Sequence, residues 1–446
     1  MPLISLMLRA SIPRIAASAA ASVRQPPSLF RQAAARMSGS AAGKATVASI
    51  LDKVKDKVVL VRADLNVPMT KKEPVEITDA TRIIGALPTV KALTAAGARV
   101  VLCSHLGRPK KTPKEEWGRL TLAPVAAELS KQLGAPVEYV TECIGDTIAP
   151  KLPAAGGVLL LENLRFDPRE EKNDPEFAAA LATSCGASFY VNDAFGAAHR
   201  AHGSTAGVAS APGIEKAVAG MLLEKELNFL QGAVLDAPKR PLVAIVGGSK
   251  VSTKLPVLES LLGAADAVLV GGAMAFTFVK ARGGAVGKSL VEDDYLEMAS
   301  ALVAKADGKL HLPTDAVCAA ALDEAAATTT VKIDEVPGEQ LGLDIGPESI
   351  DAYRAIIAGA GTVVWNGPMG VFEMKPFAAG TLAVATELAE ATKKGAISVV
   401  GGGDSVAAAN QMGLAPSMSH VSTGGGASLE LLEGKILPGV AALDDA

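Results

Sequence analysis

One pattern recurs along most of this chain. A short run of Val, Ile, Leu and Ala ends abruptly in polar residues or glycine, and a helical stretch follows. Near-continuous apolar runs of this kind are typical of parallel strands that are buried on both faces. The sequence therefore predicts an α/β fold of doubly wound, Rossmann-like parallel sheets, which bind ligands at the carboxyl ends of their strands. The runs occupy residues 58–66, 100–105, 158–163, 189–193, 242–249, 267–272, 362–367 and 397–404, and helical periodicity marks 123–133, 221–233 and 379–392.

The composition agrees with this plan and excludes several classes of protein. Apolar residues make up 49% of the 446 residues and charged residues 20%, which is ordinary for a globular protein and unlike a disordered chain. The formal net charge of −4 argues against nonspecific nucleic-acid binding, and no apolar run is long enough to span a membrane. The cysteines are far apart, so we expect reduced core thiols rather than disulfides or a metal site. They are Cys103, Cys143, Cys185 and Cys318.

The first 36 residues differ from the rest of the chain. They contain five arginines, five serines and no acidic residue; the first acid is Asp52. An Arg- and Ser-rich segment without acids is typical of an organellar transit peptide, and the alternative is a disordered cytosolic tail. A secretory signal fits less well, because the apolar run precedes the first basic residue.

The strand ends of the first half are basic and rich in amides. Arginine binds carboxylate or phosphate groups through two parallel hydrogen bonds, so this half predicts a site for a small anion. A single arginine here would more often form a surface ion pair, but three at successive strand ends weaken that interpretation. The polar strand-end residues are Asp64, Asn66, His105, Arg108, Asn163, Arg165, Asn192, Asp193, His199, Arg200 and His202.

The strand ends of the second half are rich in glycine. Glycine lets a ligand approach the backbone closely and exposes amides at the start of the next helix, as in nucleotide sites. A Pro-rich, charged break at 235–241 separates the halves and predicts a domain boundary. The glycine-rich ends lie at 247–248, 271–272, 366–370, 401–404 and 424–426.

Charged residues within the glycine-rich half favour phosphate chemistry. Lys250 and Lys254 are four residues apart, so on a helix they share a face and can neutralise a phosphoryl group. Asp404 follows three glycines and could hold Mg²⁺ on nucleotide phosphates, or cap a helix, or both. Glu373 could accept a hydrogen bond from a ribose hydroxyl.

Two familiar motifs fail when they are tested. Residues 283–289 resemble a P-loop, but Arg282 stands where the first glycine is required, so we expect a surface loop. The G-x-G-x-x-G fingerprint of dinucleotide-binding dehydrogenases is absent. A dehydrogenase and an anion-binding protein without chemistry remain the rival interpretations, and the second leaves the two lysines and Asp404 without a use.

The motifs taken together resemble those of the phosphoglycerate kinase family, in the family's order, from about Thr46 to the C-terminus. The substrate-domain motifs are RADLNVP (62–68), SHLGRP (104–109), LLENLRF (160–166) and VNDAFGAAHRAH (191–202). The nucleotide-domain motifs are GGSKVSTK (247–254), WNGPMGVFE (365–373), GGGD (401–404) and STGGGAS (422–428). Departures are mild: Ser249 and Ser405 replace small residues that vary in the family, Ala197 stands where Thr is more usual, and 307–338 matches loosely.

The resemblance implies a reaction and a set of site residues. The reaction is reversible in-line transfer of a phosphoryl group between 1,3-bisphosphoglycerate and MgADP, which gives 3-phosphoglycerate and MgATP in glycolysis or the Calvin cycle. The implied catalytic residues are Arg82, Lys250 and Lys254, and the implied Mg²⁺ ligand is Asp404. The implied 3-phosphoglycerate site comprises Asp64, Asn66, Arg82, His105, Arg108, Arg165 and Arg200. The implied nucleotide site comprises Lys254, Gly271, Gly272, Gly342, Leu343, Asn366, Glu373, Gly402, Gly403, Asp404 and Ser405.

The resemblance also implies an organisation for the chain. We expect a transit peptide at 1–36, a substrate domain at 37–235, a nucleotide domain at 236–426 and a C-terminal segment at 427–446 that returns to the first domain. A hinge helix would join the two domains, and the enzyme would be a monomer. Details of the motifs resemble plant and algal members, so we expect a plastid, with the mitochondrial matrix as the alternative.

Overall fold

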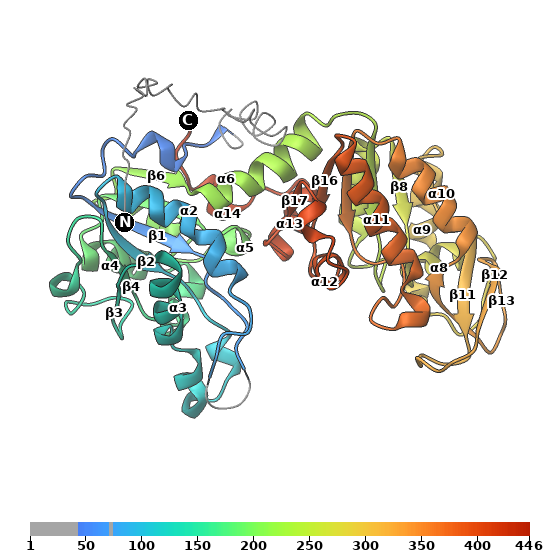
Figure 1. The fold of residues 1–446 in the computed structure, drawn as a ribbon, viewed down its shortest axis with the longest axis horizontal. Helices are drawn as coiled ribbons and strands as arrows, with labels where there is room; N and C mark the ends of the chain where they lie inside the picture. The colour runs from blue at the N-terminus through green and yellow to red at the C-terminus, as the bar shows by residue number, and fades with distance from the viewer. Residues whose placement is uncertain (1–42, 71–74) are drawn as a thin grey trace, which may run out of the picture. The chain divides into compact units, whose positions relative to one another are not determined.

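Two six-stranded parallel sheets account for most of the strands in the computed structural model, which describes residues 43–70 and 75–446 (Figure 1). All eight of the predicted strands are present, so the predicted α/β class of two parallel-sheet domains is confirmed. The predicted transit peptide at 1–36 lies outside the described residues.

The first sheet has the strand order β3-β4-β2-β1-β5-β6. Its strands are β1 (Val58–Ala63), β2 (Arg99–Cys103), β3 (Val137–Tyr139), β4 (Val158–Leu160), β5 (Phe189–Asp193) and β6 (Lys216–Ala219). In the register, Val59 of β1 lies between Val100 of β2 and Phe189 of β5. The chain changes direction across the sheet between β1 and β5, which is the place where α/β sheets bind ligands.

Helices cover both faces of this sheet. Val59 and Val61 pack in one core with α2 (Thr81–Ala95) and α3 (Ala123–Leu133), whereas Leu60 packs in another with α4 (Pro175–Cys185). Successive side chains of a strand point to opposite faces. Burial on both faces therefore explains why the strands read as continuous apolar runs.

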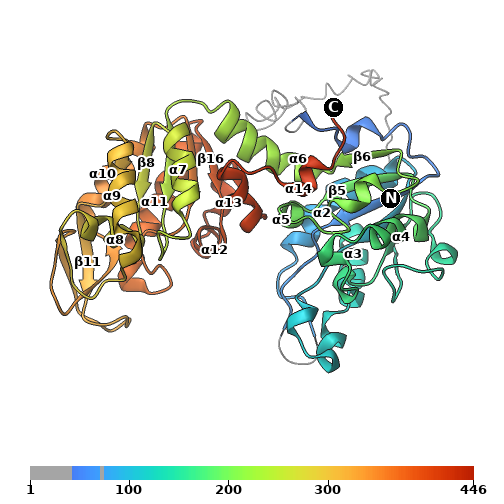
Figure 2. The ribbon, with the colours of Figure 1, turned by 180° about the vertical axis from the view of Figure 1, so that it is seen from behind.

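The second sheet has the order β10-β8-β7-β15-β16-β17, with its change of direction between β7 and β15. Its strands are β7 (Leu242–Val246), β8 (Ala267–Val270), β10 (Leu310–His311), β15 (Thr362–Asn366), β16 (Ile397–Val400) and β17 (His420–Val421). One face packs against α10 (Pro347–Ala358), α11 (Ala379–Lys393) and α12 (Gly403–Gln411). The other packs against α7 (Leu255–Ala264), α8 (Met274–Ala281) and α9 (Leu296–Lys305), and Figure 2 shows α7 on the side away from α10 and α11.

A single helical segment connects the last strand of the first sheet to the first strand of the second. It begins as the α-helix α6 (Met221–Leu227) and continues as the π-helix η9 (Asn228–Asp236). The periodicity at 221–233 predicted this helix but not its change of winding. π-Helical turns are rare and often lie at functional positions.

The end of the chain contacts the first sheet. After α13 (Gly426–Leu432) and α14 (Pro438–Ala441), the backbone oxygen of Asp444 accepts a hydrogen bond from Ala45 N at 2.8 Å. Its carboxylate accepts another from Ala217 N at 2.8 Å. The division of the chain at 37–235, 236–426 and 427–446 stays a prediction.

The elements that the sequence did not predict are short or polar. Residues within and after 307–338 form an antiparallel sheet of β11 (Asp315–Ala319), β12 (Thr328–Lys332) and β14 (Leu341–Ile345). The surface loop expected at 283–289 contains a two-residue strand that the sequence did not predict, because β9 (Ala285–Val286) pairs with β13 (Glu335–Val336). Strands of two to five residues, such as the largely exposed β12, offer too few positions for a recognisable period.

The cysteines agree with the sequence analysis. All four cysteines are buried and free, as expected of core thiols. In residues 43–70 and 75–446, no helix has the length and apolar character needed to cross a bilayer.

Candidate active site

The predicted substrate residues lie at the carboxyl edge of the first sheet. Asp64 and Asn66 follow β1, His105 and Arg108 follow β2, and Arg165 follows β4. Arg200 lies beyond β5, after the short helix α5 (Phe195–Ala198), and Arg82 is in the first turn of α2. Parallel pairing places all of these strand ends on one edge.

Asp64 and Arg82 form an ion pair with a direct hydrogen bond from Arg82 Nη1 to Asp64 Oδ2. The Asp64 side chain is 2% exposed, and a buried carboxylate requires such a partner. Arg82 Nη2 also donates to the backbone oxygen of Thr423 at 3.5 Å. Arg82 therefore connects the end of β1 with the loop that follows β17.

Arg62 is a central residue of this edge that the sequence analysis did not select. It is fully buried within β1, where its Nη2 lies 2.9 Å from His105 Nδ1. Its Nε donates to Ser204 Oγ at 2.9 Å, and its Nη1 donates to Ala63 O at 2.7 Å. All three nitrogens of the guanidinium therefore have hydrogen-bond partners. Because Nδ1 of His105 must accept this hydrogen bond, and because burial and nearby arginines disfavour the charged form, the pKa of His105 is well below its usual value. An arginine inside an apolar strand was the signal that could have identified it.

The side chains of Asn66 and Arg165 both form hydrogen bonds with the backbone of Gly107. Asn66 Oδ1 accepts a hydrogen bond from Gly107 N at 2.9 Å, and Arg165 Nη1 donates to Gly107 O at 2.8 Å. Arg165 Nε is buried without a hydrogen bond in the described chain, although Glu171 Oε1 lies 3.5 Å away as an ion pair. Burial also lowers the pKa of the Arg165 guanidinium. A buried donor without an acceptor indicates a place where a ligand oxygen can bind.

The pKa of His202 reflects the excess of positive charge at this edge. Burial, together with electrostatic repulsion from Arg165, Arg62 and Arg200, lowers its pKa to about 4. The buried carboxylate of Glu170 accepts hydrogen bonds from Ser204 N at 2.8 Å and Ser204 Oγ at 2.6 Å. The arginines outnumber the carboxylates beside them, and the histidines stay neutral. Such an edge suits an anion with several negative charges.

Lys254 stands at the carboxyl edge of the second sheet, immediately before α7. Its Nζ donates to Asn366 Oδ1 at the end of β15. Burial lowers the pKa of Lys254, while the negative charges of Asp404 and Glu433 oppose that shift. Lys254 is therefore a half-buried ammonium group beside the β7–β15 switch point.

The glycine-rich turn after β16 is fastened to the end of β15. Asn366 Nδ2 donates to Gly401 O at 3.1 Å. Ser405 Oγ donates to the same oxygen at 2.8 Å and accepts from Gly367 N at 2.6 Å. Gly402 precedes α12, and Gly403 and Asp404 open it. These contacts place the backbone amides at the start of α12 beside Lys254.

Asp404 is exposed in the first turn of α12 and has no hydrogen-bond partner for its carboxylate among the described residues. Mg²⁺ on a nucleotide usually needs only one or two protein carboxylates, with phosphates and waters as its other ligands. The described residues contain no cluster of three or more potential metal ligands. A free carboxylate at a glycine-rich turn fits a metal ion that arrives with its nucleotide.

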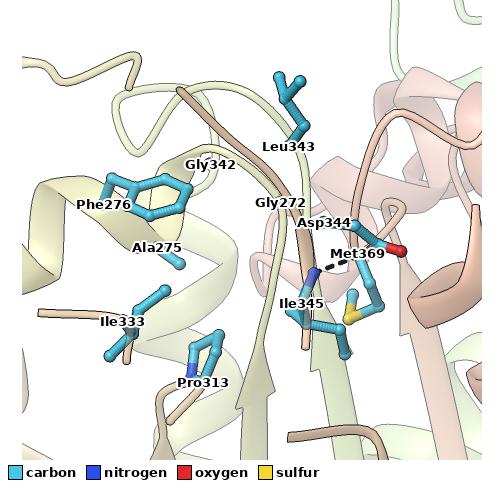
Figure 3. A pocket seen from close by; sticks show the side chains of 10 residues that line it. All are labelled: Gly272, Ala275, Phe276, Pro313, Ile333, Gly342, Leu343, Asp344, Ile345 and Met369. Atoms are coloured by element: carbon cyan, nitrogen blue, oxygen red, sulfur yellow. Dashed lines mark hydrogen bonds between the residues drawn. The ribbon is translucent and has the colours of Figure 1, made fainter. Parts of the chain in front are cut away.

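A pocket on the second half of the chain is lined by three of the predicted nucleotide residues. Gly272, Gly342 and Leu343 surround it with Ala275 and Phe276 (Figure 3). The glycines here also have a packing role. A Cβ atom at Gly342 would lie 1.9 Å from Phe276 Cζ, and one at Gly272, where φ is +70°, would lie 2.5 Å from Gly248 O. Close approach within the protein, as well as a ligand, therefore accounts for the glycine-rich strand ends.

Several predicted residues have side chains without hydrogen bonds or ion pairs in the part of the chain that the structure describes. Arg108, Lys250 and Glu373 are exposed, and none has a side-chain hydrogen bond or ion pair within the described ranges. Arg200 is exposed as well and acts on the site only through its charge. The two predicted lysines therefore differ in their environments. Lys254 is held by Asn366, whereas Lys250 is exposed.

The family model and the relatives described next share one name. The family model described as phosphoglycerate kinase matches residues 49–435. A chloroplastic phosphoglycerate kinase of Volvox carteri is 57% identical over 394 residues, which cover 87% of this chain and 83% of that protein. A phosphoglycerate kinase of Picosynechococcus sp. is 55% identical over 392 residues, 87% of this chain and 96% of the relative.

Solved structures agree with the sequence comparisons. Phosphoglycerate kinase from Coxiella burnetii has a TM-score of 0.80 and 43% identity, over 90% of this chain and 98% of that one. Phosphoglycerate kinase from Pyrococcus horikoshii has a TM-score of 0.74 and 32% identity, over 89% and 98%. Both sequence and fold match over nearly the whole described chain, and the chain therefore belongs to the phosphoglycerate kinase family.

Proposed function

We propose that this chain catalyses the reversible transfer of a phosphoryl group between the acyl phosphate of 1,3-bisphosphoglycerate and MgADP. Family membership makes it a kinase whose acceptor is a carboxyl group. The observation that carries the proposal is the pairing of two different sites: an arginine-rich edge on one parallel sheet and a lysine- and glycine-rich edge on the other. One suits the phosphoglycerate anion and the other a nucleotide.

The arginine-rich edge binds the acid. Arg165 supplies a donor, because its buried Nε makes no hydrogen bond and has only the ion pair with Glu171. Arg62 holds His105 and Ser204 in place at the same edge. Arg108 and Arg200 are exposed and unpaired, so their guanidinium groups are available to carboxylate and phosphate oxygens. These arginines repel one another in the free protein, and a bound anion attracts all of them.

The nucleotide binds at the lysine- and glycine-rich edge of the second sheet. Its adenine binds beside Gly272, Gly342 and Leu343, where the pocket of about 10 Å³ must widen to admit the ring. Glu373 accepts a hydrogen bond from the ribose, and the phosphates lie at the amides of the start of α12. Asp404 would hold Mg²⁺ there. When bound, the metal ion neutralises phosphate charge and orients the oxygens.

No nucleophilic side chain is needed for the transfer. Positioning and charge neutralisation lower the barrier, and Arg82, Lys250 and Lys254 stabilise the charge that develops on the phosphoryl group. The helical connection through η9 would serve as the hinge for a closure that brings the two ligands in line and excludes water. We propose that the enzyme acts as a monomer.

An assay of ATP formation tests the proposal most simply. With 1,3-bisphosphoglycerate and MgADP, the full chain should produce ATP and 3-phosphoglycerate. An anion-binding protein without chemistry would bind 3-phosphoglycerate but form no ATP, and a dehydrogenase would instead change the absorbance of a nicotinamide cofactor.

Replacement of Asp404 by Asn should weaken the use of Mg-nucleotide and spare the binding of 3-phosphoglycerate. Loss of one metal ligand is expected to lower activity roughly 10- to 100-fold at limiting Mg²⁺. Steady-state rates over a Mg²⁺ titration check this, with Asp351→Asn on the exposed side of α10 as the control. Full activity of Asp404→Asn at limiting Mg²⁺ would leave Asp404 with a capping role only.

Arg82→Ala and Lys254→Ala should each lower kcat on the order of 10²- to 10³-fold, because each removes a charge that acts on the transition state. The Kd for 3-phosphoglycerate should change far less. If both groups act on one phosphoryl group, the double variant should lose much less than the product of the two single losses.

Measurements of kcat and of the 3-phosphoglycerate Kd for the singles and the double decide this prediction. Lys305→Ala, at the exposed end of α9, is the matched control and should change kcat less than twofold. An unchanged kcat in either single variant, with a native circular dichroism spectrum, would remove that residue from the catalytic set.

We infer a plastid location, with the mitochondrial matrix as the alternative. Support comes from the arginine-rich, acid-free residues 1–36 and from the chloroplastic relative at 57% identity. Residues 1–40 fused to a fluorescent protein should enter plastids, and a chain that begins at Met37 should fold and catalyse like the full chain. Diffuse cytosolic fluorescence would contradict the location.

A further inference from the structure

We infer that Asp344 is a positioning residue for the nucleotide, which holds the end of β14 against the loop 366–373 and the start of α11. The inference rests on the proposed function, because it assigns the pocket of Figure 3 to the adenosine part of the nucleotide. Asp344 is the only ionisable residue among those of the described chain that line this pocket. It follows directly after Gly342 and Leu343.

The Asp344 carboxylate is held by backbone groups. It is 4% exposed; Oδ1 accepts from its neighbour Ile345 N at 2.9 Å, as the dashed line in Figure 3 shows. Oδ2 accepts from Gly380 N at 2.7 Å, in the first turn of α11. The carboxylate thus joins the last residues of β14 to the positive end of a 15-residue helix.

No opposite charge compensates this burial in the described residues. Burial raises the pKa of Asp344 to about 7, and the N–H groups of Gly380, Ile345 and Ala379 act in the opposite direction. Such a carboxyl group is kept only where its contacts offset the cost of burial, and for Asp344 those contacts lie in the wall of the pocket.

The same carboxylate fills the space beside Gly370. A Cβ atom on Gly370 would lie 2.3 Å from Asp344 Oδ1, so only glycine fits next to it. The loop is then fastened to both walls of the pocket, because Val371 N donates to Leu343 O at 2.9 Å and Met369 O accepts from Gly272 N at 2.9 Å. Glu373, which we assign to the ribose, lies three residues beyond Gly370.

These contacts make Asp344 the shared support of the adenine wall and the ribose loop. Its removal should loosen Leu343 and Glu373 together, without reaching the phosphates at α12 or the arginine-rich edge. The expected change is a loss of nucleotide affinity in both the ground state and the transition state. Such a loss raises KM for the nucleotide and leaves kcat nearly unchanged.

Asp315 offers a matched control. It lies on β11, which pairs with β14, and its buried carboxylate accepts from Glu348 N at 3.0 Å and Ser349 N at 2.9 Å in the first turn of α10. A Cβ atom on Gly346 would lie 2.3 Å from it, so the local arrangement repeats that of Asp344. Asp315 does not line the pocket.

The test compares Asp344→Asn and Asp315→Asn in the full chain, in the direction that consumes 3-phosphoglycerate. Both variants should lower Tm. Asp344→Asn should raise KM for MgATP about tenfold and change kcat and the KM for 3-phosphoglycerate less than twofold, whereas Asp315→Asn should leave both KM values within twofold. An unchanged MgATP KM in Asp344→Asn, or an equal rise in Asp315→Asn, would overturn the inference.

Hydrogen exchange on the wild-type chain keeps the inference testable if Asp344→Asn does not fold. MgADP should slow amide exchange at both Ile345 and Gly380, and 3-phosphoglycerate alone should not. Unchanged exchange at these amides under saturating MgADP contradicts the role of Asp344. Failure of the wild-type chain to form ATP would instead overturn the proposed function.

Discussion

Burial of both faces of the two parallel sheets is the constraint on which the rest of the structure depends. Helices cover each face, so the strands can carry little except apolar side chains along their length. Polar groups are then confined to the strand ends, and parallel pairing brings the carboxyl ends to one edge. The sites therefore lie beside the β1–β5 and β7–β15 switch points.

Arg62 is the exception that shows how demanding this constraint is. It lies within β1 with no exposure, and it is accommodated because His105, Ser204 and the backbone oxygen of Ala63 accept its donors. Burial and the charges of the nearby arginines, Arg62 among them, keep His105 and His202 neutral, and the charge of Arg62 adds to that of Arg165 and Arg200. The excess positive charge of this edge is therefore balanced only when an anion binds.

The sequence predicted the long strands, the two-sheet plan and the positions of the strand-end residues, because buried runs and polar or glycine stops are local signals. It did not predict contacts between distant segments, such as Arg82 with Asp64 or Lys254 with Asn366. Arg82 was identified only through the family resemblance. The role of Asp344 depends on Gly370 and Gly380, and the sequence gives no sign that they meet. The two-residue strands β9 and β13 were missed because two positions define no period.

The electrostatic account of the substrate edge is tested most directly by NMR titration of His202, with and without 3-phosphoglycerate. In the free protein, burial and the arginines should hold its pKa at about 4. A bound anion would neutralise those arginines, so the pKa of His202 should rise by about one pH unit or more. A His202→Gln variant assigns the resonance. A pKa near the usual value of about 6.5 in the free protein, or a pKa that 3-phosphoglycerate leaves unchanged, would contradict the account.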